Sequence, residues 1–172
     1  VLPYDKNDVL NLMEYSQKNA IPLLARGGGS SQCGQTVNEA IVLDYSKHQN
    51  QVLELNVKEK FVWVQPGIVL DTLNSYLKPH GLWFPVDVST SSRATIGGMT
   101  GNNSCGSRSL YYGNMVNNVL AVEAILDNGS IHTFEDIDKN YLKVTNNQNR
   151  KYEIIKKFLD IKEETKNDID QY

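Results

Sequence analysis

The 172-residue sequence lacks the features that define several large classes of protein. Its two cysteines, Cys33 and Cys105, are too few for a disulfide scaffold or a metal knuckle, and a reducing, cytoplasmic setting is expected. No apolar run approaches the roughly 20 residues needed to span a bilayer, so no membrane span is predicted. The 17 basic and 20 acidic residues give a net charge of −3, which offers no electrostatic basis for nucleic-acid binding.

The sequence also lacks the motifs of enzymes whose own side chains or bound metal carry out the reaction. The sequence shows no Ser-His-Asp set, carboxylate pair or metal-ligand spacing, and the three histidines, His48, His80 and His132, fall in turn or strand contexts. Neither the P-loop pattern G-x-x-x-x-G-K-[ST] nor the dinucleotide fingerprint G-x-G-x-x-G occurs. We therefore expect no catalytic residue and no metal site within this chain.

Glycine and proline disappear from the last part of the sequence. All 12 glycines and all 5 prolines lie before residue 134, whereas residues 135–172 carry 17 of the 37 charged side chains. The composition predicts a domain at 1–134, followed at 135–172 by a charged connector and an amphipathic helix containing Ile155 and Phe158. Because the chain lacks an initial Met and this helix lacks an evident packing partner, we expect it to be part of a longer protein.

The apolar pattern of the first 134 residues predicts short helices and strands in alternation. Asn7 or Asp8 can cap an N-terminal helix whose apolar face includes Val9. Strands are expected at 21–25, 40–45, 52–55, 61–64, 119–126 and 131–134, and a second helix at 69–79. Asn128-Gly129 favours a type I′ hairpin turn. The expected fold class is α+β: a small helix–strand subdomain followed by a mostly antiparallel sheet with helices.

A glycine-rich run directly after the first strand is the strongest sign of a ligand. Gly27, Gly28 and Gly29 lack Cβ atoms, so the backbone can approach a ligand closely and adopt positive φ. Successive N–H groups in such a turn form an anion-binding concavity, to which Arg26 and Ser30 add charge and a further donor. A pyrophosphate fits this chemistry; a flexible turn without a ligand is the alternative.

A second glycine-rich segment spans residues 94–106. Its Gly97 and Gly98 allow another close backbone approach, while Ile96 and Met99 can pack. One chain with two such segments around strands indicates a long ligand that is held mainly by backbone groups.

Five runs of sequence carry a family resemblance: IPLLARGGGSSQCGQTV, AIVLDYS, WVQPGIVLDTLNSYLKPHGLWFPVD, TIGGMTGNNSCGSRSLYYG and NNVLAVEAILDNGSI. In order and spacing they resemble FAD-linked oxidoreductases of the PCMH, or vanillyl-alcohol oxidase, type. Within that group the resemblance is to the D-lactate dehydrogenase and glycolate oxidase subunit branch, which includes relatives fused to iron–sulfur modules. Residues 1–134 are thus similar to the N-terminal part of a PCMH-type FAD-binding domain.

The resemblance implies that both glycine-rich segments and the turns near them contact FAD. The implied cofactor-binding residues are Arg26, Gly27, Gly28, Gly29, Ser30, Ser31, Gln35, Pro66, Gly67, Pro85, Asp87, Thr95, Ile96, Gly97, Gly98, Asn103, Ser104, Gly106, Tyr112 and Gly113. Two of them keep a second interpretation: Arg26 either pairs with a phosphate or is a structural cation held by a carboxylate, and Asp87 either contacts the cofactor or braces a nearby loop. Tyr112 is expected to be a packed aromatic near the flavin or adenine.

The resemblance also implies chemistry. Some relatives attach flavin covalently through a His or Cys, but Ser30 stands where that His often follows the glycine loop, so noncovalent FAD is expected. The parent activity would be oxidation of a 2-hydroxy acid such as D-lactate or glycolate by hydride transfer to FAD. Substrate residues would belong to a C-terminal domain outside this chain, an iron–sulfur module could accept the electrons, and the parent protein could lie peripherally on a membrane. The alternatives are a flavoenzyme like UDP-N-acetylenolpyruvoylglucosamine reductase and a non-catalytic flavin-binding module.

Overall fold

The computed structural model describes residues 1–34, 36–137, 141–144 and 149–169. The chain forms two compact units, Val1–Val119 and Leu120–Tyr172. The boundary between the two units lies just before the hairpin at residues 121–135. The domain boundary at residue 134, expected from composition, remains a prediction.

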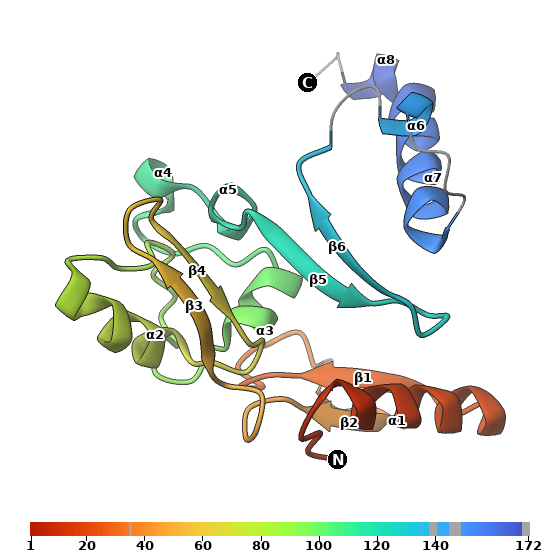
Figure 1. Cartoon of the computed structure of the whole chain (residues 1–172), viewed down its shortest axis with the longest axis horizontal. Helices are drawn as coiled ribbons and strands as arrows, with labels where there is room; N and C mark the ends of the chain where they lie inside the picture. The colour runs from red at the N-terminus through yellow and green to blue at the C-terminus, as the bar shows by residue number, and fades with distance from the viewer. Residues whose placement is uncertain (35, 138–140, 145–148, 170–172) are drawn as a thin grey trace. The chain divides into compact units, whose positions relative to one another are not determined.

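The first unit carries helices and two pairs of strands (Figure 1). Its elements are α1 (Lys6–Asn19), β1 (Leu23–Arg26), β2 (Ile41–Asp44), β3 (Val52–Asn56), β4 (Phe61–Val64), α2 (Leu70–Leu77), η1 (Lys78–His80), α3 (Ile96–Gly101), α4 (Ser109–Tyr112) and α5 (Met115–Asn118). The elements of the second unit are β5 (Ala121–Ile125), β6 (Ile131–Glu135), α6 (Tyr141–Val144), α7 (Arg150–Glu164) and α8 (Lys166–Ile169). The mixed content confirms the α+β class.

The N-cap of helix α1 lies two or three residues earlier than the sequence predicted. Asp5 is the N-cap, and its Oδ1 accepts hydrogen bonds from the backbone N–H of Asn7 at 2.8 Å and of Asp8 at 3.1 Å. The expectation that Asn7 or Asp8 caps the helix is therefore wrong. Asp8 lies inside the first turn, where its Oδ2 accepts from the backbone N–H of Tyr4 at 2.7 Å.

Strands β1 and β2 form the single parallel pair among the described strands, and β3–β4 and β5–β6 are antiparallel. The parallel register runs from Leu23 opposite Ile41 to Arg26 opposite Asp44. The connection between the two strands contains the glycine-rich loop and no described helix, although parallel strands are usually joined through one. Arg26 and Asp44 therefore lie side by side at the edge where this loop leaves the sheet.

The core of the first unit lies under α2 and α3. Its buried residues are Ile68, Leu70, Leu73, Leu77, Val86, Ala94, Ile96, Met99 and Met115. Backbone hydrogen bonds join the entrances of the two helices: Leu70 N–H donates to Ala94 O at 3.0 Å, and Ile96 N–H donates to Ile68 O at 2.9 Å. The turn before α2 and the second glycine-rich segment are thus fixed against each other.

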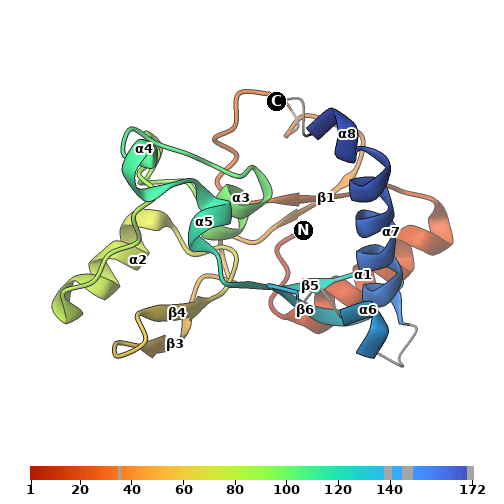
Figure 2. The same cartoon turned by 90° about the horizontal axis from the view of Figure 1, so that it is seen from above.

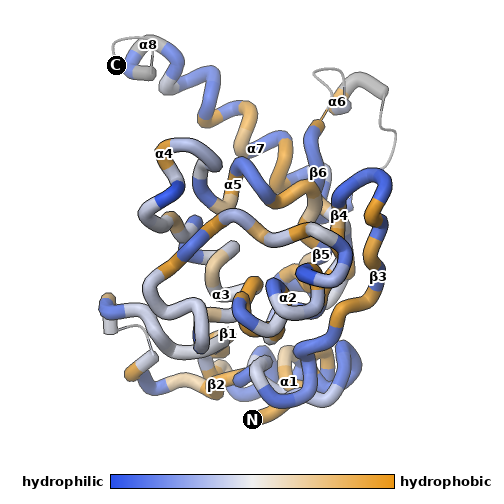
Figure 3. Tube along the Cα trace, turned by 90° about the vertical axis from the view of Figure 1, so that its left-hand side faces the viewer, coloured by the Kyte–Doolittle hydropathy of each residue, from blue (hydrophilic) through white to orange (hydrophobic). Residues whose placement is uncertain are grey.

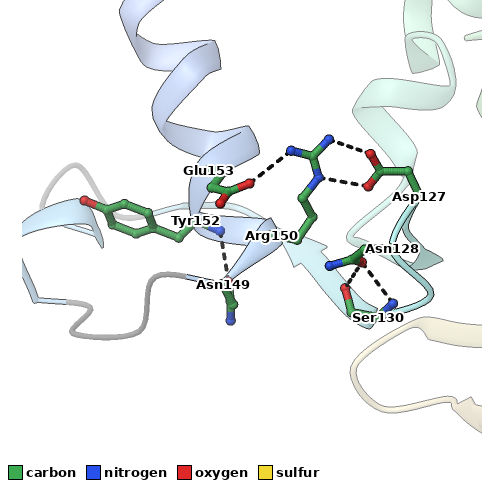
Figure 4. Close-up of polar contacts among 7 residues, drawn as sticks. All are labelled: Asp127, Asn128, Ser130, Asn149, Arg150, Tyr152 and Glu153. Carbon is green, nitrogen blue, oxygen red and sulfur yellow. Dashed lines mark hydrogen bonds and ion pairs between the residues drawn. The ribbon is translucent and has the colours of Figure 1, made fainter.

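The β5–β6 turn differs from the expected type I′. That type needs positive φ at both central residues, whereas Gly129 has φ 77° and Asn128 is outside the positive range. Gly129 N–H donates to Leu126 O at 2.8 Å, and Asn128 Oδ1 accepts from Ser130 N–H at 3.0 Å (Figure 4). The Leu126–Gly129 hydrogen bond thus closes a turn that ends in left-handed Gly129, and the Asn128 side chain holds Ser130.

Helix α7 lies in the segment for which the sequence predicted an amphipathic helix, and hydrophobic and hydrophilic residues alternate along it in Figure 3. Asn149 caps it by accepting from Tyr152 N–H at 3.0 Å. Arg150 binds the hairpin turn through Asp127, with Nε–Oδ1 at 2.8 Å and Nη2–Oδ2 at 2.7 Å (Figure 4). Ile155 is 4% exposed, and Phe158 is 67% exposed.

This difference gives a matched pair of variants in α7. We expect Ile155→Ala to lower the free energy of unfolding by about 2–4 kcal/mol, because it opens a cavity at a buried position. Phe158→Ala removes a larger but exposed side chain and should cost less than about 1 kcal/mol. Urea denaturation followed by circular dichroism measures both, and equal losses would contradict the packing of α7.

Candidate cofactor site

The two glycine-rich segments are in direct contact within the first unit. A Cβ added at Gly27 would overlap Thr95 Oγ1, and a Cβ added at Gly28 would overlap the carbonyl oxygen of Arg93. Both positions therefore require glycine, because the Gly27 backbone lies against the Thr95 side chain and the Gly28 backbone lies against that of Arg93. The contact brings together residues that are separated by more than 60 positions in the sequence.

The glycine loop presents main-chain donors. Among the described residues, the N–H groups of Gly28, Gly29 and Ser30 have no hydrogen-bond acceptor. Gly29 has φ 62°, the left-handed conformation that turns successive N–H groups toward one side. The Ser30 hydroxyl is near Thr90, with 3.4 Å between the two Oγ atoms. The loop is therefore able to donate several hydrogen bonds to an anion.

Arg26 is held by a carboxylate. Its Nη1 lies 2.6 Å from Asp44 Oδ2, and Asp44 Oδ1 accepts from Ser46 N–H at 2.9 Å and Ser46 Oγ at 2.6 Å. Burial alone would raise the pKa of the Asp44 carboxyl, but the Ser46 hydrogen bonds and the Arg26 charge together lower it below its ordinary value. The geometry favours a structural role for Arg26, and a phosphate contact remains a prediction.

Part of the second glycine-rich segment forms helix α3 (Ile96–Gly101), where the sequence predicted no helix. Thr95 caps it, with its Oγ1 accepting from Gly98 N–H at 3.3 Å, and Gly97 N–H donates to Pro66 O at 2.8 Å. Ile96 is 9% exposed, so its side chain packs in the core. Gly67 approaches the backbone of Tyr45 and Gln49, where a Cβ would overlap. The predicted residues at 66–67 and 95–98 therefore meet.

Asp87 braces the segment that follows α3. Its Oδ2 accepts from Ser107 Oγ at 2.7 Å, and its Oδ1 accepts from Arg108 N–H at 3.0 Å. The hydrogen bond from Ser107, assisted by that from the Arg108 backbone, lowers the pKa of the Asp87 carboxyl. Gly106 lies directly against the Asp87 backbone, where a Cβ would overlap. The alternative of a loop-bracing Asp87 is thus what the geometry supports.

Helices α3 and α5 contact each other, and Figure 2 shows them as neighbours. Asn103, at φ 45°, accepts from Val116 N–H through its Oδ1 at 3.0 Å. The carbonyl of Ser104 accepts from Met115 N–H at 3.1 Å. The described hydrogen bonds of Asn103 and Ser104 thus join the two helices.

Tyr112 belongs to an aromatic group. Its ring centroid is 5.2 Å from that of Trp83 and 4.7 Å from that of Tyr111, both edge-on, and the Arg108 guanidinium lies 5.2 Å from the Trp83 ring centroid. Beside this group is an open depression of about 460 Å³, lined by Ser107, Arg108, Leu110, Tyr111 and Tyr112.

Three of the residues predicted to bind the cofactor have no described contact with the two glycine-rich segments. Pro85 is half-buried, without a described polar contact, Gly113 turns the chain at φ 78°, and Gln35 lies outside the described residues. Sequence reasoning missed Asp44, Thr90 and Arg93, which border the glycine loop. The hydroxyl-rich run S-T-S-S-R before Ala94 was an available signal for two of them. In the described part of the chain no group of three metal-ligating side chains is found, and no helix is long and apolar enough to cross a membrane.

A family model described as an FAD binding domain matches residues 1–135. The chain belongs to this FAD-binding family. FAD is accordingly the cofactor of its fold, and the resemblance stated from the sequence is confirmed. The clustered glycines, the unpaired loop N–H groups and the hydroxyls of Ser30 and Thr90 are chemically suited to a pyrophosphate.

Curated relatives share this region. The chain is 50% identical over 121 residues to D-2-hydroxyglutarate dehydrogenase of Haemophilus influenzae, which covers 70% of this chain and 12% of the relative. It is 31% identical to a glycolate oxidase subunit of Bacillus subtilis, over 76% of this chain and 28% of the relative. It is 35% identical to D-lactate dehydrogenase of Archaeoglobus fulgidus, over 76% of this chain and 29% of the relative. The chain thus spans well under a third of these proteins.

Solved structures share the fold. Alkyldihydroxyacetonephosphate synthase matches with a TM-score of 0.68 at 25% identity, over 83% of this chain and 26% of that one. 6-Hydroxy-D-nicotine oxidase from Arthrobacter nicotinovorans matches with a TM-score of 0.69 at 18% identity, over 81% of this chain and 30% of that one. The second likeness concerns the fold alone.

Two glycines of α3 provide a test of the contact with Pro66. We expect Gly97→Ala to lower the free energy of unfolding by about 1–3 kcal/mol, because a Cβ there would lie 2.5 Å from Pro66 Cβ. In Gly101→Ala the added Cβ meets no atom within 4 Å. This variant should raise the free energy of unfolding by about 0.4–1 kcal/mol, because alanine lowers the conformational entropy of the unfolded chain. Urea midpoints measure both, and a neutral Gly97→Ala would contradict the close approach.

The lowered pKa of Asp44 predicts a pH dependence. A carboxyl whose pKa is lower in the folded state stabilises the fold above its unfolded pKa of about 3.9, and this contribution is lost as pH falls through the folded value. Asp44→Asn should therefore be less stable than the parent at pH 7, with a smaller difference at pH 3. Thermal unfolding at the two pH values checks this, and a difference independent of pH would refute the ion pair's contribution.

Proposed function

We propose that this chain is the FAD-binding portion of a flavin-dependent oxidoreductase that oxidises a 2-hydroxy acid of the D-2-hydroxyglutarate, D-lactate or glycolate class. The single observation that carries the proposal is the contact between the two glycine-rich segments, which gathers unpaired N–H groups and hydroxyls at one place. The names of the relatives support the substrate class, with D-2-hydroxyglutarate joining the two acids expected from the sequence.

In this proposal the chain binds and orients the cofactor. Gly28, Gly29 and Ser30 donate hydrogen bonds to the pyrophosphate, and the Pro66–Gly67 turn and α3 form an adjoining rigid wall. When bound, FAD supplies the acceptor for a hydride from the substrate α-carbon. Binding is noncovalent, with Ser30 in the place of an attachment residue, and removal of the substrate hydroxyl proton is assigned to residues beyond this chain.

The surroundings of the parent enzyme are part of the same proposal. The substrate would bind to a C-terminal domain, and an iron–sulfur centre or another carrier would accept the electrons. The free thiols Cys33 and Cys105 support a reducing, cytoplasmic setting. Peripheral attachment of the parent protein to a membrane is compatible with this location.

A charge substitution in the loop tests FAD binding. Ser30 is exposed, so Ser30→Asp adds a negative charge beside the phosphates without burying a side chain. We expect the Kd for FAD to rise about 100-fold, since a like charge close to a diphosphate costs several kcal/mol. The neutral variant Ser30→Asn, of the same size, should stay within about threefold of the parent.

Quenching of flavin fluorescence on titration with the chain measures the three Kd values. Equal affinities of the Asp and Asn variants would place the pyrophosphate elsewhere. Loss of the yellow colour from the protein on acid precipitation is expected for noncovalent FAD, and retention would show a covalent bond.

A further inference from the structure

We propose that the Arg26–Asp44 ion pair is a positioning device for the glycine loop, through which Arg26 supports the cofactor by holding Gly29 and without itself pairing with a phosphate. The inference rests on the proposed function in one respect, that this loop receives the FAD pyrophosphate.

The pair stands where the loop leaves the sheet. Arg26 is the last residue of β1 and lies in register with Asp44, the last residue of β2. The Nη1–Oδ2 distance of 2.6 Å joins the two strand ends, and Tyr45 N–H donates to Arg26 O at 3.0 Å. Ser46 supplies two further hydrogen bonds to the other carboxylate oxygen. The Asp44 carboxylate is thus fully engaged and fixes the direction of the guanidinium.

The guanidinium of Arg26 fills the space beside Gly29. A Cβ built on Gly29 would lie 2.6 Å from Arg26 Nη2, 2.9 Å from Nε and 3.0 Å from Cζ. A flat guanidinium can occupy that space, because Gly29 has no side chain and adopts φ 62°. Arg26 therefore packs against the residue whose conformation turns the loop, and it would hold the neighbouring N–H groups in place before any ligand arrives.

The charge balance also argues against a direct phosphate contact. The positive charge of Arg26 is matched by Asp44 at hydrogen-bond distance, so the pair as a whole offers little net attraction to an anion. Preorganised neutral donors bind a phosphate without that attraction, as in other main-chain anion sites. Arg93, whose backbone contacts Gly28, has no described carboxylate partner and remains as a separate source of positive charge.

The two roles of Arg26 predict opposite results for Asp44→Asn. A positioning role requires Asp44, so its loss should raise the Kd for FAD about tenfold, as should Arg26→Gln. The double variant should be no weaker than either single variant, because both act on one contact. If Arg26 paired with a phosphate, Asp44→Asn would free its charge and leave the Kd unchanged or lower. Either of those results would overturn the proposal.

The conservative variant Arg26→Lys separates shape from charge. Lysine keeps the positive charge but not the planar group beside Gly29, so positioning predicts a loss of about tenfold, and affinity equal to the parent's would overturn it. Lys47→Gln removes an exposed charge close to Asp44 in the sequence, from a side chain with no described contact with the ion pair, and should leave the Kd unchanged. Circular dichroism shows which variants are folded, and only these are compared. If Arg26→Gln does not fold, Arg26→Lys still tests the proposal, because it keeps a cation that can pair with Asp44.

Backbone amide NMR relaxation on the FAD-free chain gives a readout independent of the cofactor. Order parameters at Gly28, Gly29 and Ser30 should be lower in Arg26→Lys and Asp44→Asn than in the parent and in Lys47→Gln, because the loop is then held less firmly. Unchanged order parameters would overturn the positioning role. Failure of the parent chain to bind FAD would instead count against the proposed function, and the relaxation data would still decide how the loop is held.

Discussion

The site depends on one close approach, between the backbone of the glycine loop at Gly27–Gly28 and the backbone and side chain of residues 93–95. Any Cβ at these two glycines would separate the segments, because carbonyl and hydroxyl oxygens already occupy the space. Thr95 contributes in two ways, since its Oγ1 lies over Gly27 and also caps α3 through Gly98. The start of α3 is thereby tied to the loop, and the core residues beneath α3 hold both.

The same segment is fixed from its other side. Gly97 donates to Pro66, and the backbones of residues 68 and 70 bond to those of residues 96 and 94. Further along, Asp87 and Asn103 hold the turns after α3. Polar contacts of this kind, placed on a well-packed core, give a binding surface its shape before the ligand is present. That agrees with a cofactor held mostly by main-chain groups.

Local sequence signals were sufficient for the strands and for α2. The alternating residues at 52–55 and 61–64 predicted β3 and β4, because each strand carries its own pattern. These signals failed for the cap of α1, because Asp5, Asn7 and Asp8 are all residue types that can cap a helix, and Asp5 is the one that does. Helix α3 was missed because I-G-G-M-T-G has poor helix propensity, and contacts with Pro66 and the Thr95 cap compensate for it.

The sequence predicted the glycines of the candidate site better than it predicted the side chains that contact its predicted residues. Glycine runs are visible in the sequence, but the carboxylate that holds Arg26 lies 18 positions away, and only the parallel register brings it near. Asp87 was recognised from the sequence as a possible brace of a nearby loop, but its partners Ser107 and Arg108 could be identified only from the fold.

The loop-only connection between β1 and β2 has a consequence for variation among homologues. Its first residues are confined by Arg26, Thr95 and Arg93, whereas the strand register beyond it is set by the β1–β2 ladder and by Val1, whose ammonium and carbonyl groups bond to the backbone of β2. These two sets of contacts lie at the two ends of the connection. Changes in its length should therefore be tolerated among homologues, since a longer loop costs little closure entropy.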